Sequence, residues 1–69
     1  MTLRIFVDDN QTNGAVFIVE NNGRDNRLTP NKPLYGCTEE EIVEYAKDYV
    51  KWVTRQEVEY YEVEYAEES

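Results

Sequence analysis

The hydrophobic pattern of the first twenty positions predicts two β-strands joined by a polar turn. From Leu3 to Asp8, apolar residues occupy every second position and form one continuous apolar face. Residues 9–14 are polar and end in Asn13-Gly14, a pair that favours tight hairpin turns. The segment from Ala15 to Glu20 is apolar on both faces, which is typical of a strand that is central in a sheet or covered on both sides.

The segment from residue 21 to residue 37 shows no regular pattern. Pro30 and Pro33 exclude a helix there and allow a strand only at a sheet edge. We expect an irregular connection that begins with a turn at Asn21-Asn22-Gly23. Three apolar residues are expected to hold this connection to the core: Leu28, Leu34 and Tyr35.

Residues 38–55 carry the repeat of an amphipathic helix. Thr38 followed by Glu41 is a capping-box sequence, which marks the start of a helix. Apolar residues recur at helical spacing over about half of the circumference; they are Ile42, Val43, Tyr45, Ala46, Tyr49, Val50, Trp52 and Val53. The opposite face is polar and consists of Glu40, Glu44, Lys47, Asp48, Lys51 and Arg55.

The segment from Val58 to Tyr65 is rich in valine and tyrosine and predicts a final strand. Because its alternation changes phase at Tyr60-Tyr61, we expect a β-bulge there. Such a bulge turns Val58, Tyr60, Val63 and Tyr65 to one face and gathers four glutamates on the other: Glu57, Glu59, Glu62 and Glu64. The alternative is that the helix continues through this segment. Residues 66–69 are expected to fray.

The expected fold is α+β in the order β-β-α-β. One amphipathic helix packs on one face of a largely antiparallel three-stranded sheet, because this is the simplest way to bury both apolar faces. A chain of 69 residues is long enough for one small domain, which we place at residues 1–69.

The net charge of −8 comes entirely from the second half of the chain. Acidic and basic residues cancel over residues 1–37, whereas residues 56–69 hold six glutamates and no basic residue. A field of this sign attracts basic surfaces and repels phosphate backbones. We therefore expect no direct contact with nucleic acid.

The composition removes most catalytic and metal-binding chemistry. The chain has no histidine, so the commonest general base and zinc ligand are missing. A calcium site is a weak alternative: Asp9 to Glu20 partly resembles the EF-hand loop, but the flanking segments are strand-like where that family has helices. We expect no enzyme activity, no metal and no cofactor. Cys37 has no second cysteine to pair with, and the N-terminal residues lack a signal-peptide layout, so we expect a cytoplasmic protein without membrane attachment.

The acidic residues of the last strand and of the polar helix face are the candidate partner-binding residues, together with Tyr61 as an exposed aromatic anchor. The set is Glu40, Glu44, Asp48, Glu57, Glu59, Tyr61, Glu62 and Glu64. The alternative for the charged residues is a solvated face that discourages edge-to-edge aggregation.

In general character the chain is similar to the nucleic-acid-mimicking inhibitors that phages encode against nucleases, glycosylases, transcription factors and CRISPR effectors. This similarity is one of small size, acidity and β-rich composition. It implies a non-catalytic inhibitor, of the DNA-mimic or anti-CRISPR kind, that blocks the basic groove of a nucleic-acid-binding protein. The alternative function is an assembly or adaptor protein that pairs through its edge strand or forms a homodimer.

Overall fold

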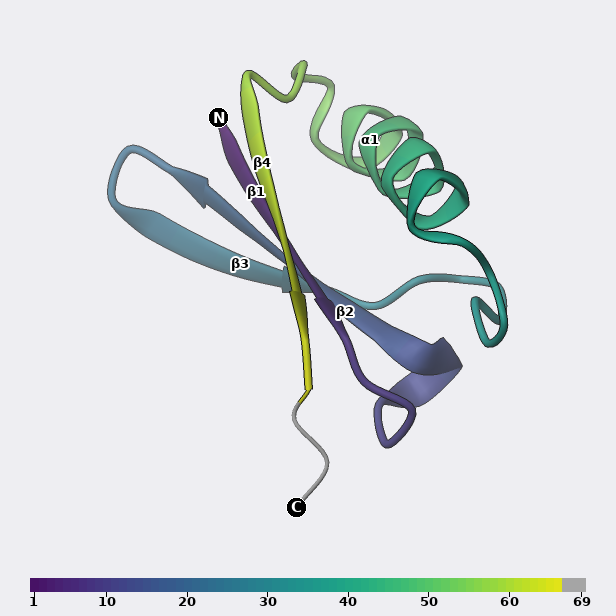
Figure 1. Ribbon diagram of the computed structural model, residues 1–69. Helices are drawn as coiled ribbons and strands as arrows, with labels where there is room; N and C mark the ends of the chain where they lie inside the picture. Colours follow the sequence, from purple (N-terminus) through teal and green to yellow (C-terminus); the bar gives the residue numbers. More distant parts are fainter. Residues whose placement is uncertain (67–69) are drawn as a thin grey trace.

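The computed structural model describes residues 1–66 and confirms an α+β fold. Its elements are β1 (Thr2–Val7), a short 3-10 helix (Thr12–Gly14), β2 (Ala15–Asn21), β3 (Arg24–Leu28), α1 (Glu39–Thr54) and β4 (Tyr60–Tyr65) (Figure 1). The strands form one sheet in the order β3-β2-β1-β4. β2 is antiparallel to both of its neighbours, whereas β4 lies parallel to β1. The sheet is therefore four-stranded and mixed, and it differs from the predicted three-stranded, largely antiparallel sheet by the additional strand β3 and by the parallel pairing of β4 with β1.

The additional strand, β3, forms a hairpin with β2. Asn22 and Gly23 both have positive φ angles, 55° and 79°, as a two-residue turn of type I′ requires. β3 itself is polar and exposed except for Leu28, which packs against the core. The segment expected to be irregular thus contains a strand, and the irregular part begins after Leu28.

α1 begins and ends close to where the sequence places it. The Thr38 Oγ1 accepts a hydrogen bond from the Glu41 N–H, and the Glu41 carboxylate accepts one from the Thr38 N–H, each at 3.2 Å. This is the predicted capping box. Arg55 ends the helix with a left-handed backbone, φ 62°, and donates its N–H to the Lys51 carbonyl at 2.8 Å.

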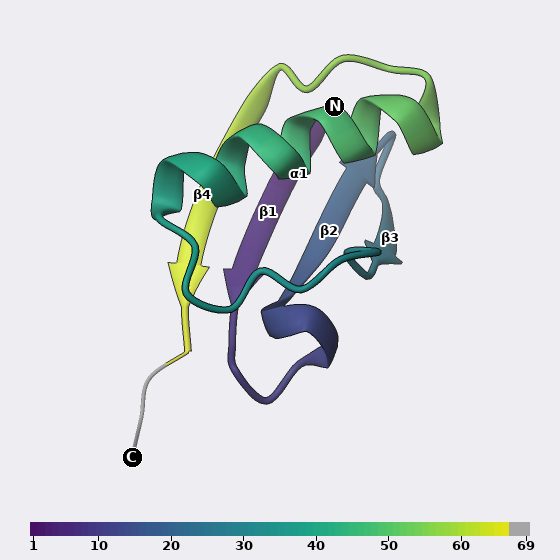
Figure 2. The ribbon, with the colours of Figure 1, turned by 90° about the vertical axis from the view of Figure 1, so that its right-hand side faces the viewer.

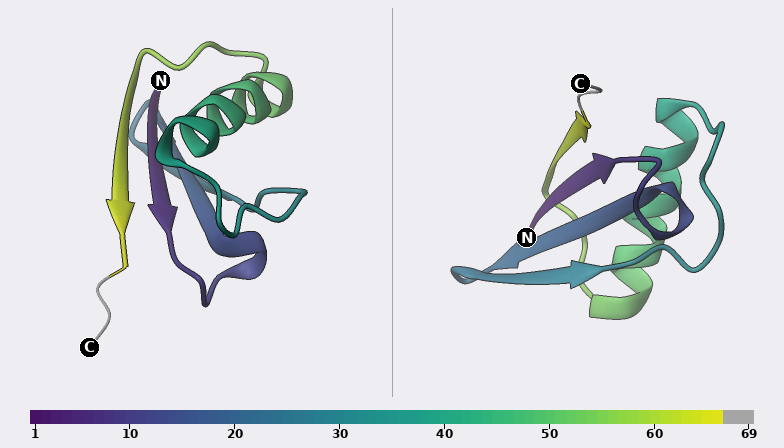
Figure 3. Two further views of the ribbon diagram at one scale, coloured as in Figure 1. Left: turned by 45° about the vertical axis from the view of Figure 1, so that its right-hand side comes forward. Right: turned by 90° about the horizontal axis from the view of Figure 1, so that it is seen from below.

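The core lies between α1 and one face of the sheet. Figure 2 shows α1 crossing over β4, β1 and β2, and Figure 3 shows the helix and its connecting segments on the same side of the sheet. The buried apolar residues come from both layers: Leu3, Ile5, Ala15, Phe17 and Val19 from the sheet, Ile42, Ala46 and Val50 from α1, and Leu34 from the connection. Trp52 is 70% exposed and Val53 is also exposed, so the buried stripe of α1 is narrower than predicted.

The last segment is a strand, as predicted, and not a continuation of the helix. Its pairing with β1 runs without interruption from Thr2 opposite Tyr60 to Val7 opposite Tyr65, so the predicted bulge at Tyr60-Tyr61 is absent. Consequently Tyr61, Val63 and Tyr65 share the core face with the β1 residues Leu3 and Ile5.

The alternation between core-facing and outward-facing residues changes phase before β4 begins and not within it. Val58 packs against the core, as predicted, while Tyr60 lies on the opposite face of the sheet from Tyr61. Ala66 donates its N–H to the Val7 carbonyl at 2.9 Å. The rest of the segment expected to fray, residues 67–69, lies outside the described residues. Within residues 1–66, α1 is too short and too polar to cross a membrane.

Candidate functional site

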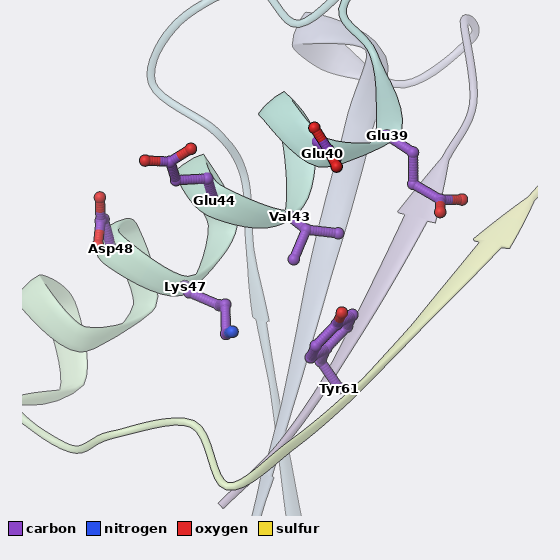
Figure 4. A pocket seen from close by; sticks show the side chains of 7 residues that line it. All are labelled: Glu39, Glu40, Val43, Glu44, Lys47, Asp48 and Tyr61. Carbon is purple, nitrogen blue, oxygen red and sulfur yellow. The ribbon is translucent and has the colours of Figure 1, made fainter.

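An open groove of about 500 Å³ separates the first half of α1 from β4. Val43, Lys47 and Tyr61 line its floor and walls, as Figure 4 shows, and the side chains of Val43 and Lys47 point toward Tyr61. Four carboxylates complete the lining: Glu39, Glu40, Glu44 and Asp48. We call this feature the α1–β4 groove. It brings together four of the predicted partner-binding residues, namely Glu40, Glu44, Asp48 and Tyr61.

Glu40, Glu44 and Asp48 form a row along the exposed side of α1, which we call the acidic row. Residues four apart on a helix lie on the same side, about 6 Å apart along the axis. All three side chains are exposed, and Figure 4 shows Glu44 and Asp48 directed away from β4. The helical period therefore places the row where a partner can reach it.

The lysines adjacent to the acidic row are engaged elsewhere. The Lys47 ammonium lies over the Tyr61 ring, 4.9 Å from its centroid. The Lys51 Nζ forms an ion pair with Glu57 at 3.1 Å. Among residues 1–66, no cation lies within ion-pair distance of Glu40, Glu44 or Asp48. Within these residues, the three carboxylates of the row are thus exposed and form no ion pair.

The glutamates of β4 have a different setting. Glu62 and Glu64 lie on the face of the sheet opposite α1, the same face as Arg4. Both carboxylate oxygens of Glu64 accept hydrogen bonds from the Arg4 guanidinium at 3.2 Å, and Glu62 accepts one from the Tyr60 hydroxyl at 3.2 Å. These two glutamates share a face, as predicted, but it is not the face of the α1–β4 groove.

Glu57 and Glu59 precede β4 and do not extend its row. Glu57 is paired with Lys51, and Glu59 lies 3.7 Å from the N-terminal ammonium. Of the four glutamates predicted to share one face of the strand, the structure places Glu62 and Glu64 on a common face. Only Glu62 and Glu64 lie on a common strand face, because the regular part of the strand begins at Tyr60.

Two tyrosines of β4 donate their hydroxyl protons to carboxylates. The Tyr65 hydroxyl donates to Glu39 at 2.9 Å across the edge of the groove, and this hydrogen bond is the main cause that raises the pKa of Tyr65. The pKa of Tyr60 is raised in the same way by its hydrogen bond to Glu62. Ionisation of either tyrosine would remove the donated proton and place two negative charges side by side.

The Glu39→Gln substitution is expected to lower the pKa of Tyr65 toward its ordinary value of 10.0. Because the folded pKa is raised, any contribution of this bond to stability is present below the unfolded pKa and is lost as the pH rises through the folded pKa. Ring-carbon chemical shifts followed by NMR from neutral to strongly alkaline pH measure both midpoints. The midpoint of Tyr60 serves as the internal control and should not move. An unchanged midpoint for Tyr65 would show that its hydroxyl does not donate to Glu39.

The sequence pattern did not single out three features of this site. Glu39 and Lys47 are groove residues, although neither was among the predicted partner-binding residues. Trp52 lies at the end of a stack with Tyr49 and Tyr45, with centroid distances of 6.5 and 5.6 Å. The Trp52 indole is exposed outside the groove, although its helical spacing predicted a position in the core.

The acidic row and the α1–β4 groove can bind a partner through negative charge and an exposed aromatic surface. Within the described part of the chain, no three acidic, histidine or cysteine side chains lie close enough together to hold a metal ion. The segment from Asp9 to Glu20, which partly resembles an EF-hand loop in sequence, forms the connection between β1 and β2, with the short 3-10 helix, and all of β2 except Asn21.

Comparison of the chain with protein-family models, with curated proteins and with solved structures finds no match.

Proposed function

We propose that the protein is a non-catalytic, acidic protein-binding module that acts in the cytoplasm. Its acidic row and the α1–β4 groove occupy the basic surface with which a partner protein binds nucleic acid. In this role it is an inhibitor of the nucleic-acid-mimicking kind, directed at a nuclease, a glycosylase, a transcription factor or a CRISPR effector. Tyr61, which is 43% exposed, serves as an aromatic anchor in the groove.

The acidic row, whose carboxylates form no ion pair within residues 1–66, carries this proposal. Two like-charge pairs at helical spacing, Glu40 with Glu44 and Glu44 with Asp48, each destabilise a helix by about 0.2–0.5 kcal/mol. A purely solvated face would gain from turning Lys47 and Lys51 toward these acids, yet both lysines are engaged with other groups. An exposed helix face that presents three carboxylates without an ion pair is available to a basic partner surface, which fits a role in binding.

The spacing and sign of the row are suited to a surface that binds phosphates. Its charges recur at about 6 Å along the helix axis, against about 3.4 Å per strand of B-DNA. The row is thus regular but sparser than a duplex. Electrostatic attraction to a basic groove accelerates encounter, and the aromatic contacts then fix the orientation of the complex.

Affinity capture at two salt concentrations tests the proposal. Immobilised protein is expected to retain a nucleic-acid-binding protein from a cell lysate at about 50 mM salt and to release it at about 500 mM, because exposed charges are strongly screened at that ionic strength. Mass spectrometry identifies the retained protein. A retained protein with no basic nucleic-acid-binding surface, or retention that is equal at both salt concentrations, would contradict the proposal.

A further inference from the structure

The outer edge of β4 is available to pair with another strand. β4 is the last strand of the sheet, and no other strand within residues 1–66 pairs with its outer edge. Because Ala66 directs its N–H to β1 and backbone direction alternates along a strand, Val63 and Tyr65 direct their N–H and C=O groups away from β1. These backbone groups can form hydrogen bonds with an added strand.

The charges beside this edge select the kind of strand that can be added. Glu62 and Glu64 line one face of β4, and the first turn of α1, with Glu39 and Glu40, lies over β4 on the other face (Figure 2). An added strand therefore meets carboxylates on both of its faces. Tyr60 and Tyr65, both more than half exposed, add apolar surface at the two ends of β4.

Pairing of β4 with a second copy of itself brings like charges together. Two antiparallel registers give the longest overlap. The first places Glu62 opposite Glu62 of the second copy, and the second places Glu62 opposite Glu64 of the second copy. Like charges directly opposite one another on neighbouring strands are destabilising. The edge is thus unfavourable for a symmetric homodimer and favourable for a basic strand.

We propose that β4 binds an extended basic segment of the partner protein by adding it to the sheet. Lysine or arginine residues at alternate positions of that segment face Glu62 and Glu64, the second of which also pairs with Arg4 of β1. The intervening residues lie beneath the first turn of α1. Main-chain hydrogen bonds to Val63 and Tyr65 supply affinity that does not depend on charge. This mode of binding rests on the proposed function, since it specifies a second contact, at the edge of β4 beside the α1–β4 groove, through which the protein holds the same partner.

A pair of substitutions at one residue separates strand addition from simple charge attraction. Tyr65→Ala and Tyr65→Pro both remove the phenol and its bond to Glu39, and both retain every carboxylate. Only the proline removes the outward N–H and places a ring in the path of an added strand. The probe is a synthetic peptide of about nine residues with lysine and threonine at alternating positions, long enough to span β4. Its affinity is measured by fluorescence anisotropy.

The peptide is expected to bind the proline variant at least about tenfold more weakly than the alanine variant, because a main-chain bond and close approach are both lost. Equal affinities for the two variants, or no binding to the wild-type protein, would overturn strand addition. Hydrogen exchange on the wild-type protein gives a second test that needs no substitution. Peptide should slow exchange at the Val63 and Tyr65 amides, and unchanged exchange there would also overturn the inference. Neither result bears on the acidic row, whose role is tested separately by charge reversal on α1.

Discussion

Replacing Phe17 with alanine is expected to leave the domain largely unfolded at 25 °C. Phe17 is fully buried in the centre of β2, and its ring lies 6.1 Å from the rings of both Tyr45 and Tyr49 on α1. Truncation of a buried phenylalanine to alanine costs about 3–5 kcal/mol. A single core in a domain of this size supplies only about 3–5 kcal/mol of stability in total. Urea denaturation followed by circular dichroism measures the loss.

Phe6→Ala is the matched control, because it removes the same side chain from the opposite face of the same sheet. Phe6 pairs with Val16 on the face that α1 does not cover and is only partly buried. Its truncation is expected to cost about 1 kcal/mol and to leave a cooperative transition. Equal losses for the two variants would contradict a core confined to the α1 side of the sheet.

Reversal of the acidic row is expected to lower the affinity for the captured partner at least about a hundredfold, in line with the size of electrostatic steering effects and of close charge pairs. The variant carries Glu40→Lys, Glu44→Lys and Asp48→Lys. Since none of these acids forms an ion pair within residues 1–66, their replacement breaks no such pair in the fold. Calorimetric titration of the purified partner measures the affinity, and thermal unfolding shows that the variant remains folded.

A second triple variant controls for net charge. Asp9→Lys, Glu20→Lys and Asp25→Lys make the same change in net charge at exposed positions away from α1 and β4. This variant is expected to lose less than about tenfold in affinity, because only the long-range attraction is reduced. If both triple variants lose affinity to the same extent, the partner responds to the overall charge of the protein and the acidic row has no special role.

The sequence alone predicted the helix and the strands that carry a clear hydrophobic pattern or a capping motif. The capping box at Thr38 and Glu41 placed the start of α1, alternation placed β1, and a segment that is apolar on both faces placed β2. β3 escaped prediction because four of its five residues are polar or charged, so no alternation marks it. It forms because the Asn22-Gly23 turn folds the chain back along β2, where its backbone groups find partners.

The direction of β4 and the face of its side chains depend on tertiary structure. Alternation shows which residues share a face, but it does not distinguish a parallel from an antiparallel neighbour. After β3, α1 crosses the sheet and delivers β4 to the far edge, parallel to β1. That register decides that Tyr61 enters the groove while Tyr60 does not. The acidic row was predictable because the helical period alone places its three residues on one side of α1. The positions of the strand glutamates were not predictable, because they depend on how β4 pairs with β1.

Displacement of nucleic acid from the captured partner tests the central claim most directly. A fluorescently labelled oligonucleotide bound to that partner is titrated with the wild-type protein and with the variant reversed at Glu40, Glu44 and Asp48. We predict that the wild-type protein releases the oligonucleotide fully and that the reversed variant needs at least about a hundredfold more protein to do so. A ternary complex in which the oligonucleotide stays bound, or equal release by both proteins, would contradict the claim that the acidic row occupies a nucleic-acid-binding surface.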